Sequence, residues 1–538
     1  MESRADDLST SVVYTVAAKA GQPITLDKFI CYLTSRDVPE SSVQDEAKNI
    51  LGNAKTVGFE VLRDEQAKYL TKFWDHADIT IEGDDALQQG LRVNMFHLLQ
   101  SVGRDSKTSI AAKGVTGEGY EGHYFWDTEM YVVPFFLHTS PEIARKLLEY
   151  RYRILDKARE RARQMAHPRG ALYAWRTIDG EECSTYYPAG TAQYHINADI
   201  AFAIKRYVEA TGDESFLVQG GAEILFETAR LWADLGSYIP NKGGKFCING
   251  VTGPDEYTAV VDNNAYTNLM AQINMRYAAE IAKWLQANNS DVYQEVAKRI
   301  GLASSEIESW NKAADNMYLP YDERLQIYAQ DDSFLNKAPW DFANTPPENY
   351  PLLIHYHPLV IYRHQVCKQA DFVLALFLLS ERFSMEEKKR NYDFYEPLTT
   401  HDSSLSSCVF SIVASEIGYH DKAYDYFMET SRMDLDDSHR NVKDGVHIAN
   451  MAGTWMSMIH GFAGMRVQSE NGAPLLAFHP HLPEKWNGYA FNMVFRGRLV
   501  RVAVNRDHVT YALLEGEELA IAHNGERLTL RKNQPLIL

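Results

Sequence analysis

The sequence predicts a mainly α-helical protein in which a closed barrel of paired helices is flanked by small β elements at both ends of the chain. Two patterns and the length carry this prediction. From about residue 84 to residue 467, apolar residues recur at helical spacing without the strand and helix alternation of a parallel sheet. After residue 468 the pattern changes to short alternating runs typical of strands. The 538 residues suffice for one large domain with smaller neighbours.

The first 40 residues are predicted to form a β hairpin. Ser11–Thr15 and Ile24–Thr34 are rich in β-branched and aromatic residues, and they flank the turn sequence Gly21–Pro23. Because an isolated hairpin is unstable, this one must pack on the rest of the chain or on a further domain. Residues 41–83 have a charged helical pattern and are predicted to be a helical linker.

Residues 84–467 are predicted to be the barrel. Ser140 is a good N-cap with Pro141 at the first helical position, and predicted helices end at Gly212 and Gly236. Helices are expected near 86–102, 193–211, 216–235, 265–287, 292–316, 366–381, 404–417, 420–433 and 453–465.

Residues 468–538 are predicted to close the chain as a small antiparallel β domain. Its strands are expected at Leu499–Val504, Val509–Leu514, Leu519–His523 and Leu528–Leu530.

The composition disfavours several classes of partner. Lys and Arg number 54 against 72 Asp and Glu, and the net charge of −18 would repel a polyanion. Binding to nucleic acid or to an acidic membrane surface is therefore not expected. The basic run Arg145–Arg169 is interleaved with acidic residues and is predicted to be a solvated helix face.

Neither a disulfide framework nor a metal site is predicted. The five cysteines are odd in number, far apart and without the spacing of zinc ligands. The acidic start of the chain lacks the apolar core of a secretory signal. The apolar stretch Phe372–Leu379 is too short to cross a bilayer, which takes ~20 residues. A cytoplasmic protein is expected.

Glu256 is the first candidate for chemistry. It lies in Gly253–Thr258, a Gly-Pro turn between two helical stretches, and loops on a rigid scaffold often carry catalytic groups. Cleavage of a glycosidic bond needs a carboxylic acid that is still protonated near neutral pH, a state that burial favours. On spacing alone, an ordinary surface turn remains the alternative.

The segment Thr399–Ser407 is the second candidate, because it leads into an apolar helix. Free backbone amides at a helix N-terminus, with hydroxyl donors and the imidazole of His401, are suited to one phosphate. A capped helix with solvated serines is the alternative. His447 precedes another helix among small residues, where it is either the opposite wall of that anion site or a core histidine.

Two further pairs complete the candidates. Trp126 beside Asp127 offers a stacking face and a hydroxyl acceptor for a sugar, with core packing of the aromatic residues as the alternative. Lys368 and Gln369 open an apolar helix, and taken alone they fit a role as capping residues.

Together these segments resemble the inverting disaccharide phosphorylases of glycoside hydrolase family 65, which act on maltose, kojibiose, nigerose, trehalose or trehalose 6-phosphate. Several long runs in the same order carry the resemblance, which extends from about residue 10 to the end. The matching runs are Gly122–Tyr131, Trp175–Thr177, Gly180–Cys183, Gly190–Ala201, Gly253–Thr258, Asp262–Asn268, Lys368–Gln369 and Thr399–Ser406.

The resemblance implies a fold and a mechanism. Family members have an N-terminal β-sandwich, a helical linker, an (α/α)6 barrel and a C-terminal β domain. It further implies that Glu256 is the general acid, that Trp126, Asp127, Lys368 and Gln369 hold the glucosyl unit, and that His401, Ser403 and Ser404 hold the phosphate. His447 remains a candidate for the phosphate site from the sequence pattern alone. Phosphate attacks the anomeric carbon with inversion and gives β-glucose 1-phosphate. Phosphate is already anionic and nucleophilic, so no catalytic base, metal or cofactor is expected.

Three points qualify what the resemblance implies. Only the last hairpin of the N-terminal sandwich is expected in this chain, and in relatives that domain helps to form a homodimer and borders the active site. An inverting α-glucosidase of the same fold, with Asp402 as its base, and a catalytically silent sugar-binding protein are the alternative functions. The segment Asp262–Asn268 is closer to kojibiose or trehalose-type members than to maltose phosphorylases.

Overall fold

The computed structural model describes residues 2–184, 188–470 and 472–538 and divides into two compact units. The first unit ends at Lys72 and the second begins at Phe73. Across the described ranges, no helix is long and apolar enough to cross a membrane.

The first unit begins with a hairpin in which β1 (Glu2–Ala5) pairs antiparallel with β2 (Thr10–Val13). The Asp6 carboxylate accepts hydrogen bonds from the backbone N–H groups of Leu8 and Ser9 and thereby closes the turn. The predicted pairing of Ser11–Thr15 with Ile24–Thr34 is wrong. Ile24–Thr34 forms no strand, because its β-branched residues have neither a partner ladder nor a buried face to pack on.

The helices of this region are η1 (Glu40–Ser42), α1 (Val43–Val57) and α2 (Phe59–Ala77), and α2 continues past the division between the units. Gly58, with φ +87°, separates α1 from α2 in a conformation that favours glycine. None of residues 2–72, all of which the structure describes, is buried.

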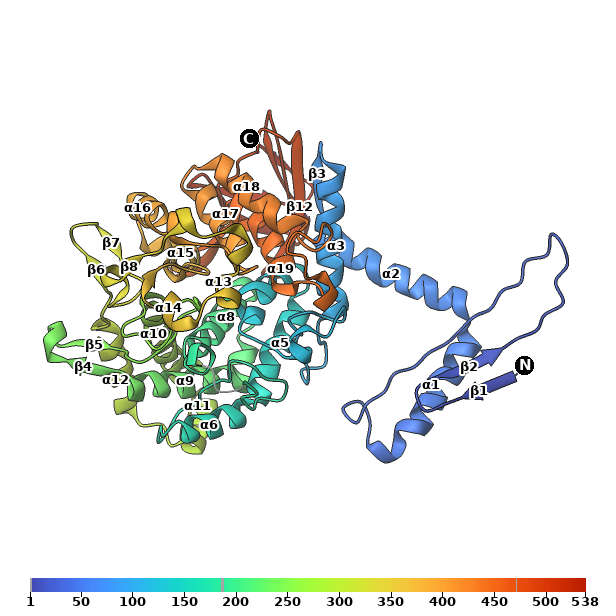
Figure 1. The fold of residues 1–538 in the computed structure, drawn as a ribbon, viewed down its shortest axis with the longest axis horizontal. Coiled ribbons are helices and arrows are strands. Elements are labelled where there is room, and N and C mark those ends of the chain that lie inside the picture. Colours follow the sequence, from blue (N-terminus) through green and yellow to red (C-terminus); the bar gives the residue numbers. More distant parts are fainter. Residues whose placement is uncertain (1, 185–187, 471) are drawn as a thin grey trace. The chain divides into compact units, whose positions relative to one another are not determined.

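The second unit is mainly helical, and the predicted (α/α)6 barrel class is confirmed (Figure 1). Its helices are α3 (Asp85–Ser101), α4 (Val133–Thr139), α5 (Pro141–Arg153), α6 (Leu155–Gln164), α7 (Pro188–Thr191), α8 (Ile196–Thr211), α9 (Ala222–Leu235), α10 (Ala265–Asn288), α11 (Ser290–Ile300), α12 (Ser304–Asp315), α13 (Leu352–His355), α14 (Pro358–Ile361), α15 (Asp371–Leu378), α16 (Met385–Tyr395), α17 (Ser406–Glu416), α18 (His420–Ser431) and α19 (Ile448–Met456).

Burial separates the inner helices from the outer ones. Every residue of α15 and α19, and all but the last residue of α17, is buried, as expected for helices that are apolar on all sides. Helices such as α11 and α18 keep an exposed polar face. Three inner segments contain a π-helical turn, namely η3 (Thr128–Val132), η4 (Leu217–Gly221) and η12 (Ser457–Phe462).

Short elements connect the helices. They are η2 (Gly119–Gly122), η5 (Pro240–Lys242), η6 (Phe334–Asn336), η7 (Phe342–Asn344), η8 (Pro347–Asn349), η9 (Ser380–Arg382), η10 (Glu396–Leu398), η11 (Val442–Asp444), β4 (Ser237–Ile239), β5 (Lys245–Cys247), β6 (Tyr321–Asp322), β7 (Ile327–Tyr328), β8 (Ala338–Pro339) and β9 (His364–Gln365).

The C-terminal strands form two sheets, ordered β10-β11-β15-β16 and β17-β14-β13-β12-β3. They are β10 (Arg466–Glu470), β11 (Ala473–Phe478), β12 (Gly488–Phe495), β13 (Arg498–Asn505), β14 (Val509–Glu515), β15 (Glu518–His523), β16 (Glu526–Arg531) and β17 (Leu536–Ile537). All pairs are antiparallel except β11 with β15.

The edge strand β3 (Ile79–Glu82) comes from the other end of the chain. It pairs antiparallel with β12, with Ile81 opposite Tyr489 and Ile79 opposite Phe491, and Figure 1 shows the two strands side by side. Ile79 is fully buried. Residues 79–82 lie within the predicted helical linker, and their strand conformation depends on a partner that no local pattern reveals.

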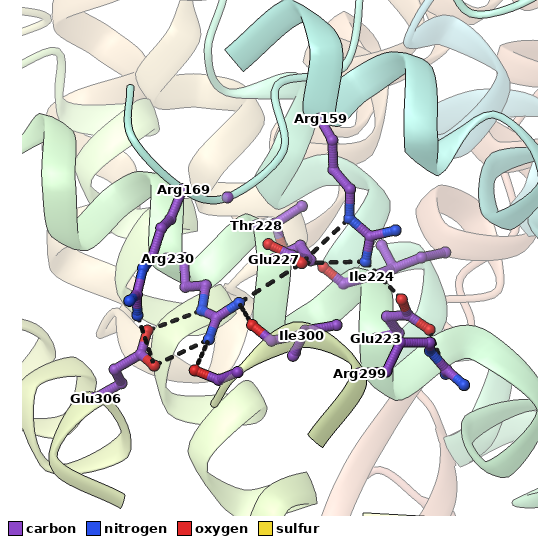
Figure 2. Close-up of polar contacts among 12 residues, drawn as sticks. Arg159, Arg169, Glu223, Ile224, Glu227, Thr228, Arg230, Arg299, Ile300 and Glu306 are labelled. Carbon is purple, nitrogen blue, oxygen red and sulfur yellow. Dashed lines mark hydrogen bonds and ion pairs between the residues drawn. The ribbon is translucent and has the colours of Figure 1, made fainter. Parts of the chain in front are cut away.

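The basic run Arg145–Arg169 differs from the predicted solvated face. Arg151 on α5 is 1 % exposed and forms a bidentate ion pair with Glu129, at 2.7 and 2.8 Å. On α6, Arg159 donates to Glu223 and Glu227 of α9 (Figure 2). Acidic partners from distant parts of the sequence therefore bury a part of this run.

Candidate active site

All residues that the sequence predicts for the site line one cleft of about 1070 Å³ in the second unit. They are Trp126, Asp127, Glu256, Lys368, Gln369, His401, Ser403, Ser404 and His447. Four of the contributing segments directly precede inner helical elements, namely η3, α15, α17 and α19. The N-terminal ends of these helices carry partial positive charge, which favours anionic ligands in the cleft.

Glu256 and Lys368 form an ion pair in the cleft. The Nζ atom of Lys368 lies 2.8 Å from Oε2 of Glu256, and the two side chains are 24 % and 22 % exposed. Burial lowers the pKa of Lys368, but the Glu256 carboxylate outweighs this effect, and the net shift is upward. The Glu256 carboxylate is therefore paired with the ammonium group of Lys368.

A buried polar network fixes the loop that carries Glu256. The Asp255 carboxylate accepts hydrogen bonds from the backbone N–H of Lys368 at 2.8 Å and from the amide of Gln330 at 2.7 Å. The backbone N–H of Asp255 donates to Asp371 at 2.7 Å. Burial raises the pKa of Asp255 to about 6 and that of Asp371 well above its usual value. The loop Gly253–Thr258, which carries Glu256 and is called the acid loop below, is thus hydrogen-bonded to the start of α15.

Gly253 allows this close approach. A Cβ atom at this position would lie 2.1 Å from Oδ2 of Asp371 and 2.5 Å from Nδ2 of Asn264. Asn264 donates to Asp371 at 2.7 Å and caps α10 through its side-chain oxygen. The Gly-Pro turn is therefore a buried structural junction rather than a surface turn.

Aromatic residues form the wall beside Asp127. Trp126 is 4 % exposed and packs edge to face on His195, with ring centroids 5.1 Å apart, while it also lines the cleft. Both interpretations of this residue from the sequence, core packing and cleft lining, therefore apply. Burial, together with the Glu256 carboxylate, raises the pKa of Asp127 to about 7.

Gln369 links the acid loop to the segment Thr399–Ser407, called the serine loop below. Its side-chain N–H donates to the carbonyl of Pro254 at 2.7 Å, and its side-chain oxygen accepts from the hydroxyl of Ser403 at 2.8 Å. Both hydrogen bonds are made within the protein, and they set the relative positions of the two loops. Ser404 lines the cleft next to Ser403.

His401 has protein partners on both ring nitrogens. Nδ1 lies 2.9 Å from the Ser406 hydroxyl and Nε2 lies 3.1 Å from the Tyr426 hydroxyl. Burial lowers its pKa to about 4, so the ring is neutral at neutral pH. The residue also has a positive φ of 56°. These contacts give His401 a part in shaping the serine loop.

Asp402, the base that the hydrolase alternative requires, is held by the protein. Its Oδ2 atom accepts hydrogen bonds from the Tyr257 hydroxyl and, at 3.0 Å, from the backbone N–H of Leu352. Tyr257 directly follows the acid Glu256 and is fully buried. One carboxylate therefore connects the acid loop, the serine loop and the segment around Leu352.

His447 lines the cleft together with three basic residues that the sequence pattern did not reveal, Lys113, His439 and Arg440. His447 is held by Asp434, with Nδ1 2.7 Å from the carboxylate. Lys113 is 5 % exposed. Burial lowers the pKa of Lys113, although Asp434 and Asp444 oppose this shift.

The glycines that follow Lys113 are a sequence feature that could have identified its loop as one that packs closely on another segment. It precedes Gly114, Gly117 and Gly119, and a Cβ atom at Gly117 or Gly119 would lie 2.6 Å from the Asp444 carbonyl oxygen. These glycines allow the loop to pack closely on the segment before α19. Within the ranges 2–184, 188–470 and 472–538, no cluster of three or more His, Cys, Asp or Glu side chains is arranged to hold a metal ion.

Three sequence profiles match the chain in order. Residues 2–73 match "Glycosyl hydrolase family 65, N-terminal domain", residues 92–456 match "Glycosyl hydrolase family 65 central catalytic domain", and residues 473–530 match "Glycosyl hydrolase family 65, C-terminal domain".

Named relatives cover nearly the whole chain. It is 57 % identical to the α,α-trehalose phosphorylase of Thermoanaerobacter brockii, over 97 % of this chain and 67 % of the relative. It is 56 % identical to the α,α-trehalose phosphorylase of Geobacillus stearothermophilus, over 89 % of this chain and 62 % of the relative. The chain thus spans about two thirds of the length of these relatives.

A solved structure has the same fold. The putative kojibiose phosphorylase from human microbiome superimposes with a TM-score of 0.86 at 32 % identity, over 93 % of this chain and 65 % of that chain.

Proposed function

Since the chain belongs to glycoside hydrolase family 65, we propose that it catalyses the inverting phosphorolysis of an α-glucosyl disaccharide, which gives β-glucose 1-phosphate and a free acceptor sugar. The observation that carries the proposal is that the carboxyl group of Glu256 and a serine loop at a helix N-terminus line one cleft. Asp402, the other carboxylate near that loop, is engaged by Tyr257 and Leu352.

In the proposed step, Glu256 donates its proton to the glycosidic oxygen while a phosphate oxygen attacks the anomeric carbon from the opposite face. The C–O bond to the acceptor breaks, the acceptor leaves as a free sugar, and Glu256 is left as a carboxylate. Lys368, 2.8 Å from Glu256, stabilises that carboxylate. We propose that the bound glucosyl unit draws Lys368 away, that Glu256 then takes up a proton from solvent before the bond breaks, and that Lys368 returns to the carboxylate once the proton has been transferred.

We propose that Ser403, Ser404 and the amides at the start of α17 hold the phosphate. Hydroxyl and backbone N–H donors at a helix N-terminus suit an anion. His401 supports them by fixing Ser406, the first residue of α17. Lys113 and His447, which line the same cleft, contribute cationic or donor groups.

We propose α,α-trehalose as the substrate to test first, because two relatives that are 57 % and 56 % identical to this chain over the aligned residues are named for it. Incubation with trehalose should release β-glucose 1-phosphate only when inorganic phosphate is present. Kojibiose, nigerose and maltose form the comparison panel. Equal release of glucose with and without phosphate would replace the proposal with an inverting α-glucosidase.

We also propose a cytoplasmic homodimer that needs no cofactor and uses phosphate as its co-substrate. Exposed apolar side chains in the first unit support self-association, among them Leu26, Tyr32 and Phe59, which are 71 %, 89 % and 52 % exposed. Light scattering of the purified chain tests this, and a monomeric mass at micromolar concentration would contradict it.

A further inference from the structure

A second cavity lies in the second unit, separate from the cleft. It has a volume of about 230 Å³ and is lined mainly by apolar side chains, including Leu137, Phe202, Phe377 and Met456. A dry apolar cavity of ~150 Å³ is already large enough to bind benzene. The size and lining suit a small hydrocarbon group and do not suit a sugar.

Cationic groups line the same cavity. Arg206 and Arg466 each pair with a carboxylate, Glu209 and Glu416 respectively, at 2.9 Å. Arg382 differs, because its guanidinium donates to the amide oxygen of Gln272 at 2.6 Å, and no carboxylate pairs with it in the part of the chain that the structure describes. Arg382 is exposed to solvent, and the exposed side chain of Glu381 lines the cavity beside it. A guanidinium without a carboxylate partner at the edge of an apolar space is complementary to a ligand that carries one negative charge.

The elements that line this cavity also reach the cleft. Lys368 and Gln369 precede α15 in the cleft, whereas Phe377 and Leu378 at the other end of α15 line the cavity. The helix α19 likewise begins beside the cleft and ends with Met456 at the cavity.

A third connection runs through η3. Trp126 and Asp127 lie immediately before this π-helical turn, in the cleft, and Met130 within the turn lines the cavity. The cavity also borders η12 through His460. Isolated π-helical turns are found frequently at functional sites in proteins.

We propose that this cavity binds a short-chain aliphatic carboxylate, with the hydrocarbon chain among Leu137, Phe202 and Met456 and the carboxylate paired with Arg382. The site is distinct from the cleft, and it is independent of the reaction proposed above. Three elements, η3, α15 and α19, have one end or flank at the cleft and another part at the cavity.

Titration calorimetry of the full chain with sodium hexanoate, and with hexanol as the uncharged probe, tests the proposal. Hexanoate should bind more tightly than hexanol. Arg382→Gln should weaken hexanoate roughly tenfold, the value of one charge-assisted hydrogen bond, and leave hexanol unchanged. Arg531→Gln is the matched control, since Arg531 is 60 % exposed, pairs with Glu518 at 3.3 Å and does not line the cavity, and hexanoate binding should persist.

Two filling variants locate the ligand. Ala203→Phe and Ala210→Leu place bulk in the cavity, and each that keeps the unfolding temperature of the parent chain should lose both probes. Glucose, the probe for the cleft, should not displace hexanoate even at saturating concentration. The proposal is overturned if hexanoate fails to bind, if Arg382→Gln weakens both probes equally, or if a folded filling variant binds as the parent does.

Discussion

At the scale of single residues, Glu256 and Asp127 respond differently to the same cleft. Lys368 faces Glu256 at 2.8 Å and stabilises its charge, while Asp127 has the Glu256 carboxylate as a neighbour that opposes its ionisation. Two acidic residues in one cleft are thus placed in different electrostatic environments, which is how acids acquire separate roles.

Glu256→Gln should reduce phosphorolysis of a disaccharide ~10²- to 10⁴-fold, because the leaving sugar is no longer protonated. Release from α-glucosyl fluoride should fall much less, because fluoride leaves without a proton. Both rates are measured as glucose 1-phosphate formed. Glu308→Gln, on the exposed surface of α12, is the control and should match the parent. Equal losses on both substrates would contradict the acid role.

Asp127 should make stability depend on pH near neutrality. Its pKa is raised to about 7 in the folded chain, so the folded state favours the protonated form. The stabilisation is complete at pH values below the unfolded pKa and is lost as pH rises through about 7. Asp127→Asn should therefore gain in unfolding temperature relative to the parent between pH 6 and pH 8.5, as measured by calorimetry. A constant difference across that range would show that Asp127 does not titrate there.

Much of the site follows from the sequence because its residues lie in continuous runs. Gly253–Thr258 and Thr399–Ser407 each combine a turn with chemically suited side chains, and the structure brings both to one cleft. The sequence pattern did not predict three further residues of the cleft, Lys113, His439 and Arg440. They belong to the site only because the fold brings them into the same cleft as Glu256. The contacts of Asp402 with Tyr257 and Leu352 likewise join segments far apart in the chain.

At the scale of elements, helices were predictable and isolated strands were not. The periodic stretch expected at 193–211 corresponds to α8, which ends before Gly212 as predicted. By contrast, Ile24–Thr34 has strand-forming residues but remains irregular, whereas Ile79–Glu82 forms a strand inside a segment that was expected to be helical linker. A helix is satisfied by its own hydrogen bonds, whereas a strand depends on a partner.

Ion pairs between α9 and the helices around it support the barrel wall (Figure 2). Arg230 is 5 % exposed, and it donates to both oxygens of Glu306 and to the carbonyls of Ile300 and Gly301. Arg169 approaches the same Glu306 at 3.7 Å, but its side chain is 63 % exposed.

These two arginines provide a matched pair for a stability test. Arg230→Met should lower the free energy of unfolding by about 3–5 kcal/mol, because it removes the bidentate partner of Glu306 and the side-chain donor to two carbonyls. Arg169→Met should change it by less than about 1 kcal/mol, as for other exposed pairs. Denaturant unfolding measures both values. Similar losses in the two variants would refute this ranking.

At the scale of the whole molecule, burial is confined to the second unit. Residues 2–72 contain no buried side chain, whereas the barrel and the C-terminal sheets contain the core. The core of the second unit is therefore explained by its own residues, and the exposed stretch 14–33 is where proteases would find backbone outside helices and strands.

Limited proteolysis should first cleave within residues 14–33, which form neither helix nor strand. The fragment that begins near residue 73 should then persist, because α3 and β3 remain within the packed unit. Mass spectrometry identifies the fragment and calorimetry compares its unfolding temperature with that of the intact chain. A fragment that unfolds at a clearly lower temperature would show that the first unit contributes to the core.

The pairing of β3 with β12 has a consequence for folding during translation. Thr80 and Ala490, which lie opposite each other, are 410 residues apart in sequence. During synthesis, Ile79 has no strand partner until Phe491 has been translated. Until then, the edge of β3 that pairs with β12 is exposed. Chaperones therefore have a defined segment to shield during translation.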